Sequence, residues 1–399
     1  MRRRLLVWSS LLLVGCGAAG EVTGPSSPGG GPTVDPMFNQ AVLHDVRLVM
    51  DSADWQALRD NFRENQYYAA NVTIDNETVR QVGIRSRGSG SRDEVKPGLK
   101  LDFNKTVKDQ EFHGYKSLVV DNIVQDASMV RERLAYAVYE GMGIPSPQIS
   151  HTRLTVNDQY WGVYALIESI TKPFLKKRLG NDAGNLFDYE YAFRWDFTYL
   201  GPDPEEYTPV PFQPETNEDH LDAQPLVDFV RTANDAPDAT FAADIAKYLD
   251  VDRFLTYVAV ENALAEHDGF VGEFGVNNFF LYQYGGSLRF TLIPWDKDTA
   301  FTAAAWPASY NLDTNVLTRR ITADPAKLRV YREALARAGS NFVNARFLGP
   351  KLDDAYSQIH SAVLSDTKKP FDNTTFEDAI RGLRGLIAAR EGDIAAQTR

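Results

Sequence analysis

The chain has 399 residues, of which 43% are hydrophobic, and a formal net charge of −12 at pH 7. The hydrophobic fraction is that of an ordinary globular protein, and the acidic balance argues against a nucleic-acid-binding protein, which normally has a basic surface. It does not argue against nucleotide binding, because a few local cations and a metal ion are enough for that. Without an N-terminal leader and linker, roughly 360 residues remain, which predicts one two-lobed domain or two tightly joined domains.

The first sixteen residues have the pattern of an export signal. The basic start Met1–Arg4 is followed by the apolar run Leu5–Val14, which is too short to remain as a membrane-spanning helix. Small residues then precede Cys16, the only cysteine, as in a bacterial lipoprotein signal, in which the cysteine is lipidated and becomes the mature N-terminus. A plain secretory signal is the alternative. Because Gly17 is not an inner-membrane retention residue, we expect a lipid-anchored protein at the outer membrane or cell surface, without an intramolecular disulfide.

Residues 17–36 are rich in glycine, proline and serine and predict a flexible linker. The pattern of strands and helices begins after this linker. In chain order, the predicted elements are a strand at 46–50, a helix capped by Ser52, a hairpin at 72–84, a loop of small residues at 85–92, a strand at 98–103, a helix at 126–141 and a hairpin at 151–167. The first half of the folded part is therefore rich in strands.

The second half is predicted to be mostly helical. Helical patterns start at Thr171, cover 252–265, and continue from Pro325 to the end of the chain. An exposed insertion rich in proline and acidic residues is expected at 201–215, and a strand hairpin at 279–294. Strands followed by helices predict an α+β fold with a small sheet-rich lobe and a larger helical lobe.

Three polar side chains flank the predicted hairpin. Asp268 lies in the run Glu266–Phe270 before it, Asn278 directly precedes its first strand, and Asp296 directly follows its second strand. Because a hairpin brings the outer ends of its strands together, we expect Asn278 and Asp296 to lie close to each other. Carboxylate and amide oxygens suit Mg²⁺, which keeps coordination sites for phosphate oxygens. This order of acid, amide and acid is the one with which a phosphotransferase holds magnesium-bound ATP.

Several of these assignments have alternatives. Asn277 competes with Asn278 as the metal ligand. Asp298 is either a second ligand or the N-cap of a following helix. An isolated Asp268-Gly269 would be a solvent-exposed turn, but the polar residues downstream favour a role for Asp268 in orienting the acceptor hydroxyl.

Eight segments in a fixed order carry a family resemblance. They are VGIRSRG at 82–88, LKLDF at 99–103, MVRERLA at 129–135, LTVN at 154–157, GVYALIE at 162–168, EHD at 266–268, NFFLY at 278–282 and PWDKD at 294–298. With this set, most of residues 44–390 resembles the CotH-type secreted kinases, first known as spore-coat proteins and remote relatives of protein kinases. One departure concerns spacing. Protein kinases place the base and the asparagine about five residues apart, whereas Asp268 and Asn278 are ten apart, so the residues between them must bulge out.

Further candidates lie in the sheet-rich half. In the alternating strand at 98–103, Lys100 points away from the apolar side chains and is the leading candidate to hold the ATP phosphates, with Lys96 as its competitor. A solvent-facing lysine on an edge strand is the alternative. Glu132, on the helix at 126–141, is a candidate to pair with Lys100 as kinase helices do, and Arg131 and Glu140 are the alternatives for the relevant charge.

The loop at 85–92 and the end of the second hairpin supply two more nucleotide contacts. Arg87, with Arg85 and Arg92, alternates with glycines in a loop that can hold phosphates through guanidinium groups and backbone N–H groups. An exposed hairpin turn is the alternative. Glu168 ends a strand where a kinase hinge would begin, so the backbone near it is expected to meet the adenine.

The resemblance implies an atypical, two-lobed kinase-like fold. Its parts would be a lipoprotein signal peptide at 1–16, a linker at 17–36, an N-lobe at 37–170 and a helical C-lobe at 171–399. Asp268 would act as the catalytic base, and Asn278, Asp296 and Asp298 as metal ligands.

The implied reaction is transfer of the ATP γ-phosphate to Ser or Thr of a secreted or surface protein, with Mg²⁺ or Mn²⁺. The implied partners are ATP and that protein, with membrane contact only through the lipid anchor and no nucleic acid. The alternative is a catalytically inactive surface adhesion or binding lipoprotein that keeps the same fold.

Overall fold

The structure is a computed structural model that describes residues 35–399. The predicted signal peptide, the lipidation site Cys16 and nearly all of the linker lie outside the described residues. Within 35–399, no helix is both long enough and apolar enough to cross a membrane.

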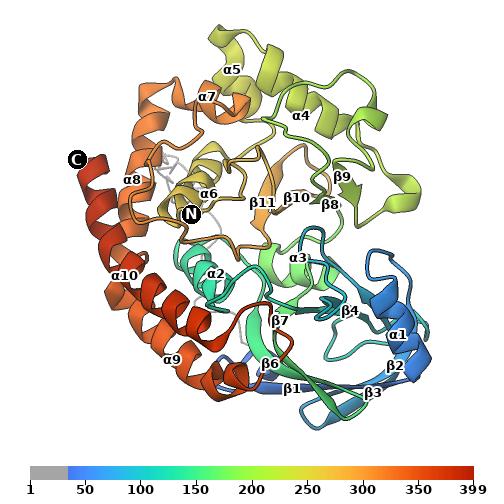
Figure 1. Cartoon of the computed structure of the whole chain (residues 1–399). Helices are drawn as coiled ribbons and strands as arrows, with labels where there is room; N and C mark the ends of the chain where they lie inside the picture. The colour runs from blue at the N-terminus through green and yellow to red at the C-terminus, as the bar shows by residue number, and fades with distance from the viewer. Residues whose placement is uncertain (1–34) are drawn as a thin grey trace, which may run out of the picture. The chain divides into compact units, whose positions relative to one another are not determined.

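The described residues form an α+β fold with two sheets, as predicted in outline (Figure 1). The first sheet is a closed barrel in the order β1-β2-β3-β4-β5-β7-β6, in which β6 runs parallel to β1 and all other neighbours are antiparallel. Its strands are β1 (His44–Met50), β2 (Tyr68–Ile74), β3 (Glu77–Ser86), β4 (Leu99–Asp102), β5 (Ser117–Asp121), β6 (Ile149–Val156) and β7 (Gln159–Glu168). Because the barrel is closed, the alternative that placed Lys100 on an edge strand is wrong: β4 pairs with β3 and β5.

The second sheet is small and lies within the helical half. It has four antiparallel strands in the order β11-β10-β8-β9, namely β8 (Asn185–Tyr189), β9 (Phe212–Pro214), β10 (Phe279–Gln283) and β11 (Phe290–Pro294). The expected hairpin at 279–294 is therefore confirmed. The expected exposed insertion at 201–215 is wrong in part, because Tyr207 and Phe212 are buried and β9 pairs with β8.

Ten α-helices and three short 3₁₀-helices complete the described part of the chain. The α-helices are α1 (Ser52–Asp60), α2 (Arg131–Gly141), α3 (Lys172–Leu179), α4 (Gln224–Asp235), α5 (Asp238–Ile245), α6 (Val251–Ala263), α7 (Val316–Thr322), α8 (Pro325–Asn341), α9 (Ala345–Leu364) and α10 (Asn373–Thr398). The 3₁₀-helices are η1 (Pro36–Phe38), η2 (Pro204–Glu206) and η3 (Glu218–His220). In Figure 1, α8, α9 and α10 lie beside one another, and α9 contacts β7 of the barrel.

Two helix starts differ from the prediction. Asp51, rather than Ser52, caps α1, because its carboxylate accepts a hydrogen bond from the Ala53 N–H. Helix α2 begins at Arg131 rather than near Asp126. The Asp126 carboxylate instead binds the Ser128 backbone and hydroxyl and the Arg131 N–H, so it orders the turn that leads into the helix.

Alternation along the strands creates two hydrophobic cores. On β5, Leu118 and Val120 point into the barrel, whereas Val119 packs into the core of the helical half. Strand β7 divides in the same way, with Tyr164 and Leu166 inside the barrel and its neighbours outside. These strands are apolar on both faces because helices cover the outside of the barrel there.

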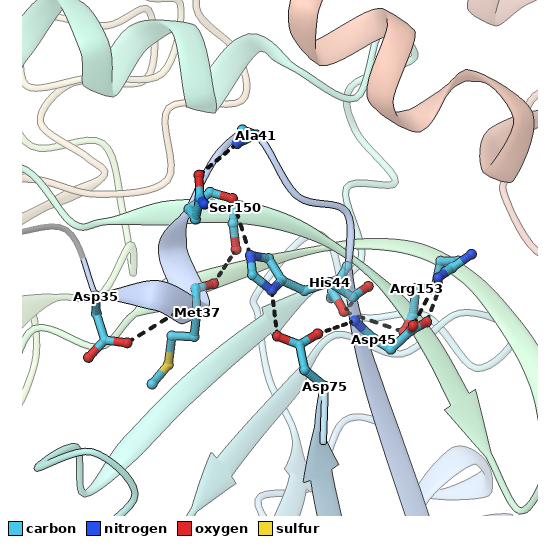
Figure 2. Close-up of polar contacts among 10 residues, drawn as sticks. Asp35, Met37, Ala41, His44, Asp45, Asp75, Ser150 and Arg153 are labelled. Atoms are coloured by element: carbon cyan, nitrogen blue, oxygen red, sulfur yellow. Dashed lines mark hydrogen bonds and ion pairs between the residues drawn. The ribbon is translucent and has the colours of Figure 1, made fainter. Parts of the chain in front are cut away.

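The first described residues are held to the barrel by polar contacts (Figure 2). His44 Nδ1 lies 2.8 Å from Asp75 Oδ2, and Ser150 Oγ donates to the Met37 carbonyl at 2.8 Å. His44 Nε2 faces the Asn39 carbonyl rather than Ser150, so the three side chains do not form a Ser-His-Asp triad. The contacts are structural and hold the first described residues against the barrel.

Candidate active site

A polar cavity of about 750 Å³ lies where the barrel meets the second sheet. Five predicted site residues line it together: Arg87, Asp268, Asn278, Asp296 and Asp298. Arg87 and Asp298, the first and last of the five in the chain, are 211 positions apart (298 − 87). The predicted convergence of the acid, amide and acid positions is therefore present in the structure.

The β10–β11 hairpin brings Asn278 and Asp296 together. Phe279 pairs with Pro294, and the Trp295 N–H donates to the Asn278 carbonyl at 3.3 Å, so Asn278 and Asp296 lie at the same end of the hairpin. Both residues have left-handed backbone conformations, with φ of +54° and +52°. Such strain in a non-glycine residue persists only when the surrounding structure enforces it, and it is common at functional sites.

Two asparagines hold the side chain of Asp268. Asn277 Nδ2 donates to Asp268 Oδ1 at 2.8 Å, and Asn278 Nδ2 donates to Asp268 Oδ2 at 3.2 Å and to its carbonyl at 2.9 Å. Each carboxylate oxygen has a second lone pair for an acceptor hydroxyl. Because Asn278 binds through its amide nitrogen and stands at the hairpin end, its amide oxygen remains for a metal ion. Of the two asparagines, the geometry favours Asn278 as the ligand.

The ten-residue spacing is accommodated by a closed loop. The Asn277 N–H donates to the Gly269 carbonyl at 3.1 Å, and the Glu273 N–H donates to the His267 carbonyl at 2.9 Å. The residues between Asp268 and Asn278 thus bulge out, as the sequence required, while the two side chains stay in contact.

Carboxylates crowd the end of the cavity where Asp296 and Asp298 lie. Burial and the nearby charge of Asp121 raise the pKa of Asp296 to about 6, although Arg87 opposes this shift. Burial and the charge of Asp296 raise the pKa of Asp298 well above its ordinary value, and burial with the charge of Glu215 does the same for Asp188. A bound divalent cation would lower the free energy of this arrangement, because it would neutralise charges that now repel one another.

The side-chain oxygens at this end of the cavity fit part of the coordination shell of Mg²⁺. No group of three or more His, Cys, Asp or Glu side chains is arranged as a complete metal site within residues 35–399. Mg²⁺ usually takes one or two carboxylates and fills its octahedron with waters and substrate phosphates. Asp296, Asp298 and the amide oxygen of Asn278 therefore suit Mg²⁺ that arrives with a nucleotide. The alternative role of Asp298 as a helix cap is wrong, since the next helix, α7, begins only at Val316.

Arg87 is the basic residue that reaches this end of the cavity. Its Nη1 donates to Asp121 Oδ2 at 2.8 Å, and its guanidinium lies 5.3 Å from the centre of the Trp295 ring. Burial alone would lower its pKa, but the surrounding acids, Asp121 and Asp296 first among them, raise it overall. Arg87 thus remains charged where phosphates would lie.

The lysine candidates do not line the cavity. Lys100 lies opposite Arg85 on the barrel, near enough to Asp188 and Glu215 that its charge lowers the pKa of both, although burial raises each overall. Lys96 is fully buried and donates to Asp366 Oδ2 and to the Val163 carbonyl, each at 2.8 Å. Lys96 therefore has a structural role, and Lys100 is at most a peripheral contact of the cavity.

The expected ion pair between Lys100 and Glu132 is wrong. Among the described residues, Glu132 contacts neither lysine candidate; its Oε1 accepts from the Tyr136 hydroxyl at 2.5 Å and from the Lys297 N–H at 3.4 Å. Burial, together with Asp296, raises the pKa of Glu132 to about 8. Glu132 lies in the first turn of α2 and contacts the segment that follows β11, through the Lys297 N–H.

Glu168 also has structural contacts and does not line the cavity. Its Oε2 accepts from the Gln148 N–H at 3.0 Å and lies 3.9 Å from Arg178 Nη2. These contacts hold the end of β7 against the segment before β6. The adenine contact predicted for the backbone near Glu168 stays a prediction.

The sequence reasoning missed two acidic residues at the site: Asp188, which lines the cavity, and Asp121, which does not line it but binds Arg87. Asp121 ends β5 and Asp188 is the second-last residue of β8, two strands that were not predicted. Each follows an apolar run, LVVD at 118–121 and LFDY at 186–189, as Asp296 follows β11. An acid at the end of a buried strand was therefore the signal that could have found them.

Comparison with known proteins gives a consistent assignment. The family model described as CotH kinase protein matches residues 84–393. The inner spore coat protein H of Bacillus subtilis (strain 168) is 26% identical over 352 residues, which cover 86% of this chain and 93% of that protein. The inner spore coat protein H-like protein of the same organism is 36% identical over 56 residues, 14% of this chain and 18% of that protein.

A solved structure, a Helicobacter pylori proinflammatory kinase named CtkA, aligns with 75% of this chain and 95% of its own. Its sequence identity is 10% and its TM-score 0.30. A score this low does not establish a shared fold.

Proposed function

The chain belongs to the CotH kinase protein family, and on this premise we propose that it is an ATP-dependent protein kinase. It would transfer the γ-phosphate of ATP to a Ser or Thr hydroxyl of a secreted or surface protein, using Mg²⁺ or Mn²⁺. The observation that carries the proposal is the meeting of Asp268, Asn278, Asp296, Asp298 and Arg87 in one cavity. The sheet-rich and helical halves would correspond to the two lobes of a kinase-like fold.

Asp268 is the residue that receives the acceptor. Its carboxylate is oriented by Asn277 and Asn278 and has lone pairs left to accept a hydrogen bond from the acceptor hydroxyl. A carboxylate is a weak base at neutral pH, but phosphoryl transfer depends mainly on holding the attacking oxygen in line. Asp268 therefore acts by orientation and takes the hydroxyl proton as the P–O bond forms.

The arginine side chains that line the cavity suit the phosphate chain. Arg85 Nη1 and Arg92 Nη2 both donate to Asn65 Oδ1, at 3.0 and 2.5 Å, so one amide oxygen holds two guanidinium groups together. Burial and the charges of Arg85, Arg87 and Arg63 lower the pKa of Arg92, which shows how closely these cations lie. Phosphate oxygens would satisfy this positive wall. The metal, when bound, would neutralise the phosphate charge at Asn278, Asp296 and Asp298.

Lipid anchoring is part of the proposal. The spore-coat relative is consistent with a location outside the cytoplasm, and the pattern around Cys16 supports attachment through a lipidated cysteine. Metabolic labelling with a fatty-acid analogue should mark the protein and leave a Cys16→Ser variant unlabelled.

Phosphate incorporation from labelled ATP tests the activity. Asp268→Ala and Asp296→Ala should each lower incorporation at least about a hundredfold, because one removes the residue that orients the acceptor and the other a metal ligand. Asp219→Ala, at an exposed position outside the cavity lining, is the matched control and should keep wild-type activity. Full activity in either cavity variant would remove that residue from its role. Wild-type protein that neither incorporates phosphate nor binds MgATP would instead support the inactive adhesion or binding lipoprotein.

A further inference from the structure

We propose that Glu261 and Lys297 are positioning residues that set the distance between the base Asp268 and the metal ligands Asp296 and Asp298. This inference rests on the proposed function. Neither residue lines the cavity, and neither was singled out by the sequence.

Lys297 holds residues 296–298 against the protein interior. It stands between Asp296 and Asp298, is fully buried, and donates from Nζ to Glu261 Oε1 at 3.0 Å. Its backbone N–H donates to Glu132 at 3.4 Å. Because the flanking residues point into the cavity while Lys297 points away from it, the lysine fixes where both carboxylates lie.

Glu261 binds both the loop that follows Asp268 and the side chain of Lys297. Its Oε1 accepts from the Phe270 N–H at 3.0 Å and its Oε2 from the Val271 N–H at 3.2 Å, directly after the base Asp268. A Cβ on Gly269 would lie 2.6 Å from Glu261 Oε1, so the loop rests against the carboxylate and a side chain there would displace it. One carboxylate on helix α6 thus binds both the loop of the base and the lysine of the metal segment.

A second contact joins the same two segments. Glu266 Oε1 accepts from the Asp268 N–H at 3.1 Å and also from the Thr299 hydroxyl. Two links, Glu261 with Lys297 and Glu266 with Thr299, therefore run from the residues around Asp268 to those around Asp296 and Asp298. Two links resist rotation as well as separation, which is what an in-line transfer requires.

Burial makes the Glu261–Lys297 link stiff. The two side chains are 1% and 0% exposed, so water does not compete for their hydrogen bonds. A buried ion pair is a poor source of stability but is costly to break by removing one partner. A role in geometry, rather than in stability, explains why charges are kept at this place.

The double variant Glu261→Gln/Lys297→Met tests the inference because it removes both charges of the pair at once, although the buried Glu266 also loses the nearby Lys297 charge. We expect kcat to fall at least about tenfold, since a misplacement of about 1 Å can cost a hundredfold. The KM for ATP should stay within about threefold, because Arg87, Asn278 and Asp296 remain. The rise in melting temperature with MgATP should persist, which is a readout independent of turnover. A variant with unchanged kcat below its melting temperature would overturn the inference.

The matched control is the exposed pair Asp244–Lys247, whose side chains are 29% and 61% exposed. Asp244→Asn/Lys247→Met makes the same kind of change away from the cavity and should keep wild-type kcat. A fall in its kcat equal to that of the Glu261/Lys297 variant would show that loss of any ion pair slows the protein, and would also overturn the inference.

The second link gives an independent test if the double variant does not fold. Thr299→Val removes the hydroxyl that binds Glu266 without a change of charge, and should lower kcat about tenfold. Thr299→Ser returns the hydroxyl and should restore kcat. Equal kcat in the two variants would count against the inference.

The wild-type protein separates this inference from the proposed function. Absence of phosphate incorporation by wild-type protein overturns the proposed function and the positioning role with it. An active wild type whose kcat survives both sets of variants overturns the positioning role alone.

Discussion

Asn277 and Asn278 lie next to each other in the sequence but contact different parts of the site. The Asn277 side chain donates only to the Asp268 carboxylate, whereas Asn278 binds Asp268 and also lies at the same end of the hairpin as Asp296. The two therefore differ in what their loss should change.

We predict that Asn277→Ala lowers kcat about tenfold without changing the Mg²⁺ requirement, because it frees one oxygen of the base. Asn278→Ala should raise the Mg²⁺ concentration needed for half-maximal activity about tenfold or more, because under the proposed function it removes a metal ligand. Titration of activity against Mg²⁺ for both variants checks this. The opposite pattern would make Asn277 the ligand.

His151 shows how a residue far from the cavity can limit stability in acid. It is buried, its Nε2 donates to the Met129 carbonyl at 2.7 Å, and its Nδ1 accepts from Arg133 Nη1 at 3.1 Å. Burial first, and the Arg133 charge second, lower its pKa from 6.5 to about 3. The native state therefore needs the neutral ring.

The pH dependence of stability follows from this shift. Above pH 6.5 the ring is neutral in both states; below it the unfolded chain binds a proton that the native state does not, so stability falls as pH drops toward 3. At pH 5 this lowers the free energy of unfolding by about 2 kcal/mol. We predict that His151→Gln reduces the loss of unfolding free energy between pH 7 and pH 5 by about this amount, measured by denaturant titration. His220→Gln, at an exposed position, is the control for adding a glutamine.

At the scale of elements, one buried ion pair joins the barrel to the connection between α9 and α10. Lys96 and Asp366 are both fully buried, and Asp366 also accepts from the Val163 N–H of β7 at 3.1 Å. Lys96 Nζ lies 2.8 Å from the carboxylate, in a place where neither charge meets water.

We predict that Asp366→Ala lowers the unfolding free energy by about 3–5 kcal/mol, because it leaves the Lys96 charge buried and unpaired. The double variant Lys96→Met/Asp366→Asn should recover most of this loss. Chemical denaturation of the three proteins measures both effects. A double variant as unstable as the single one would mean that packing, rather than the unpaired charge, is what matters.

Hairpins and helices with a strong local pattern were predictable at this scale. The β6–β7 hairpin, helix α6 and the β10–β11 hairpin occur where alternation or helical spacing placed them. Strands β5 and β8 were missed because they are short and surrounded by loops, so that little alternation can be seen. Helix α2 started late because the Asp126 side chain supplied a local turn that competes with the helix.

At the scale of the whole molecule, nucleotide binding should stabilise the fold. The cavity takes side chains from the barrel, β8 and the β10–β11 hairpin, so a ligand that bridges them binds the native state alone. At a MgATP concentration one hundred times its Kd, the added stability is about 2.7 kcal/mol.

We predict a rise of several degrees in melting temperature with MgATP and a smaller rise with ATP and a chelator, because the crowded carboxylates repel unneutralised phosphates. Asp296→Ala should bring the two conditions closer together. No shift at millimolar MgATP would contradict nucleotide binding and favour a binding protein without turnover.

The sequence by itself determined the α+β class, the hairpin that joins Asn278 to Asp296, and Asp268 as their neighbour. These follow from local periodicity and from residues a few positions apart, which the chain geometry alone brings together. Only the tertiary structure decided that Arg87, rather than Lys100 or Lys96, lines the cavity together with Asp296 and Asp298. It also decided that Glu132 contacts the Lys297 N–H, that Asp188 lines the cavity, and that Asp121 binds Arg87. Those outcomes depend on how the closed barrel packs against the second sheet, a long-range arrangement that no local pattern of side chains encodes.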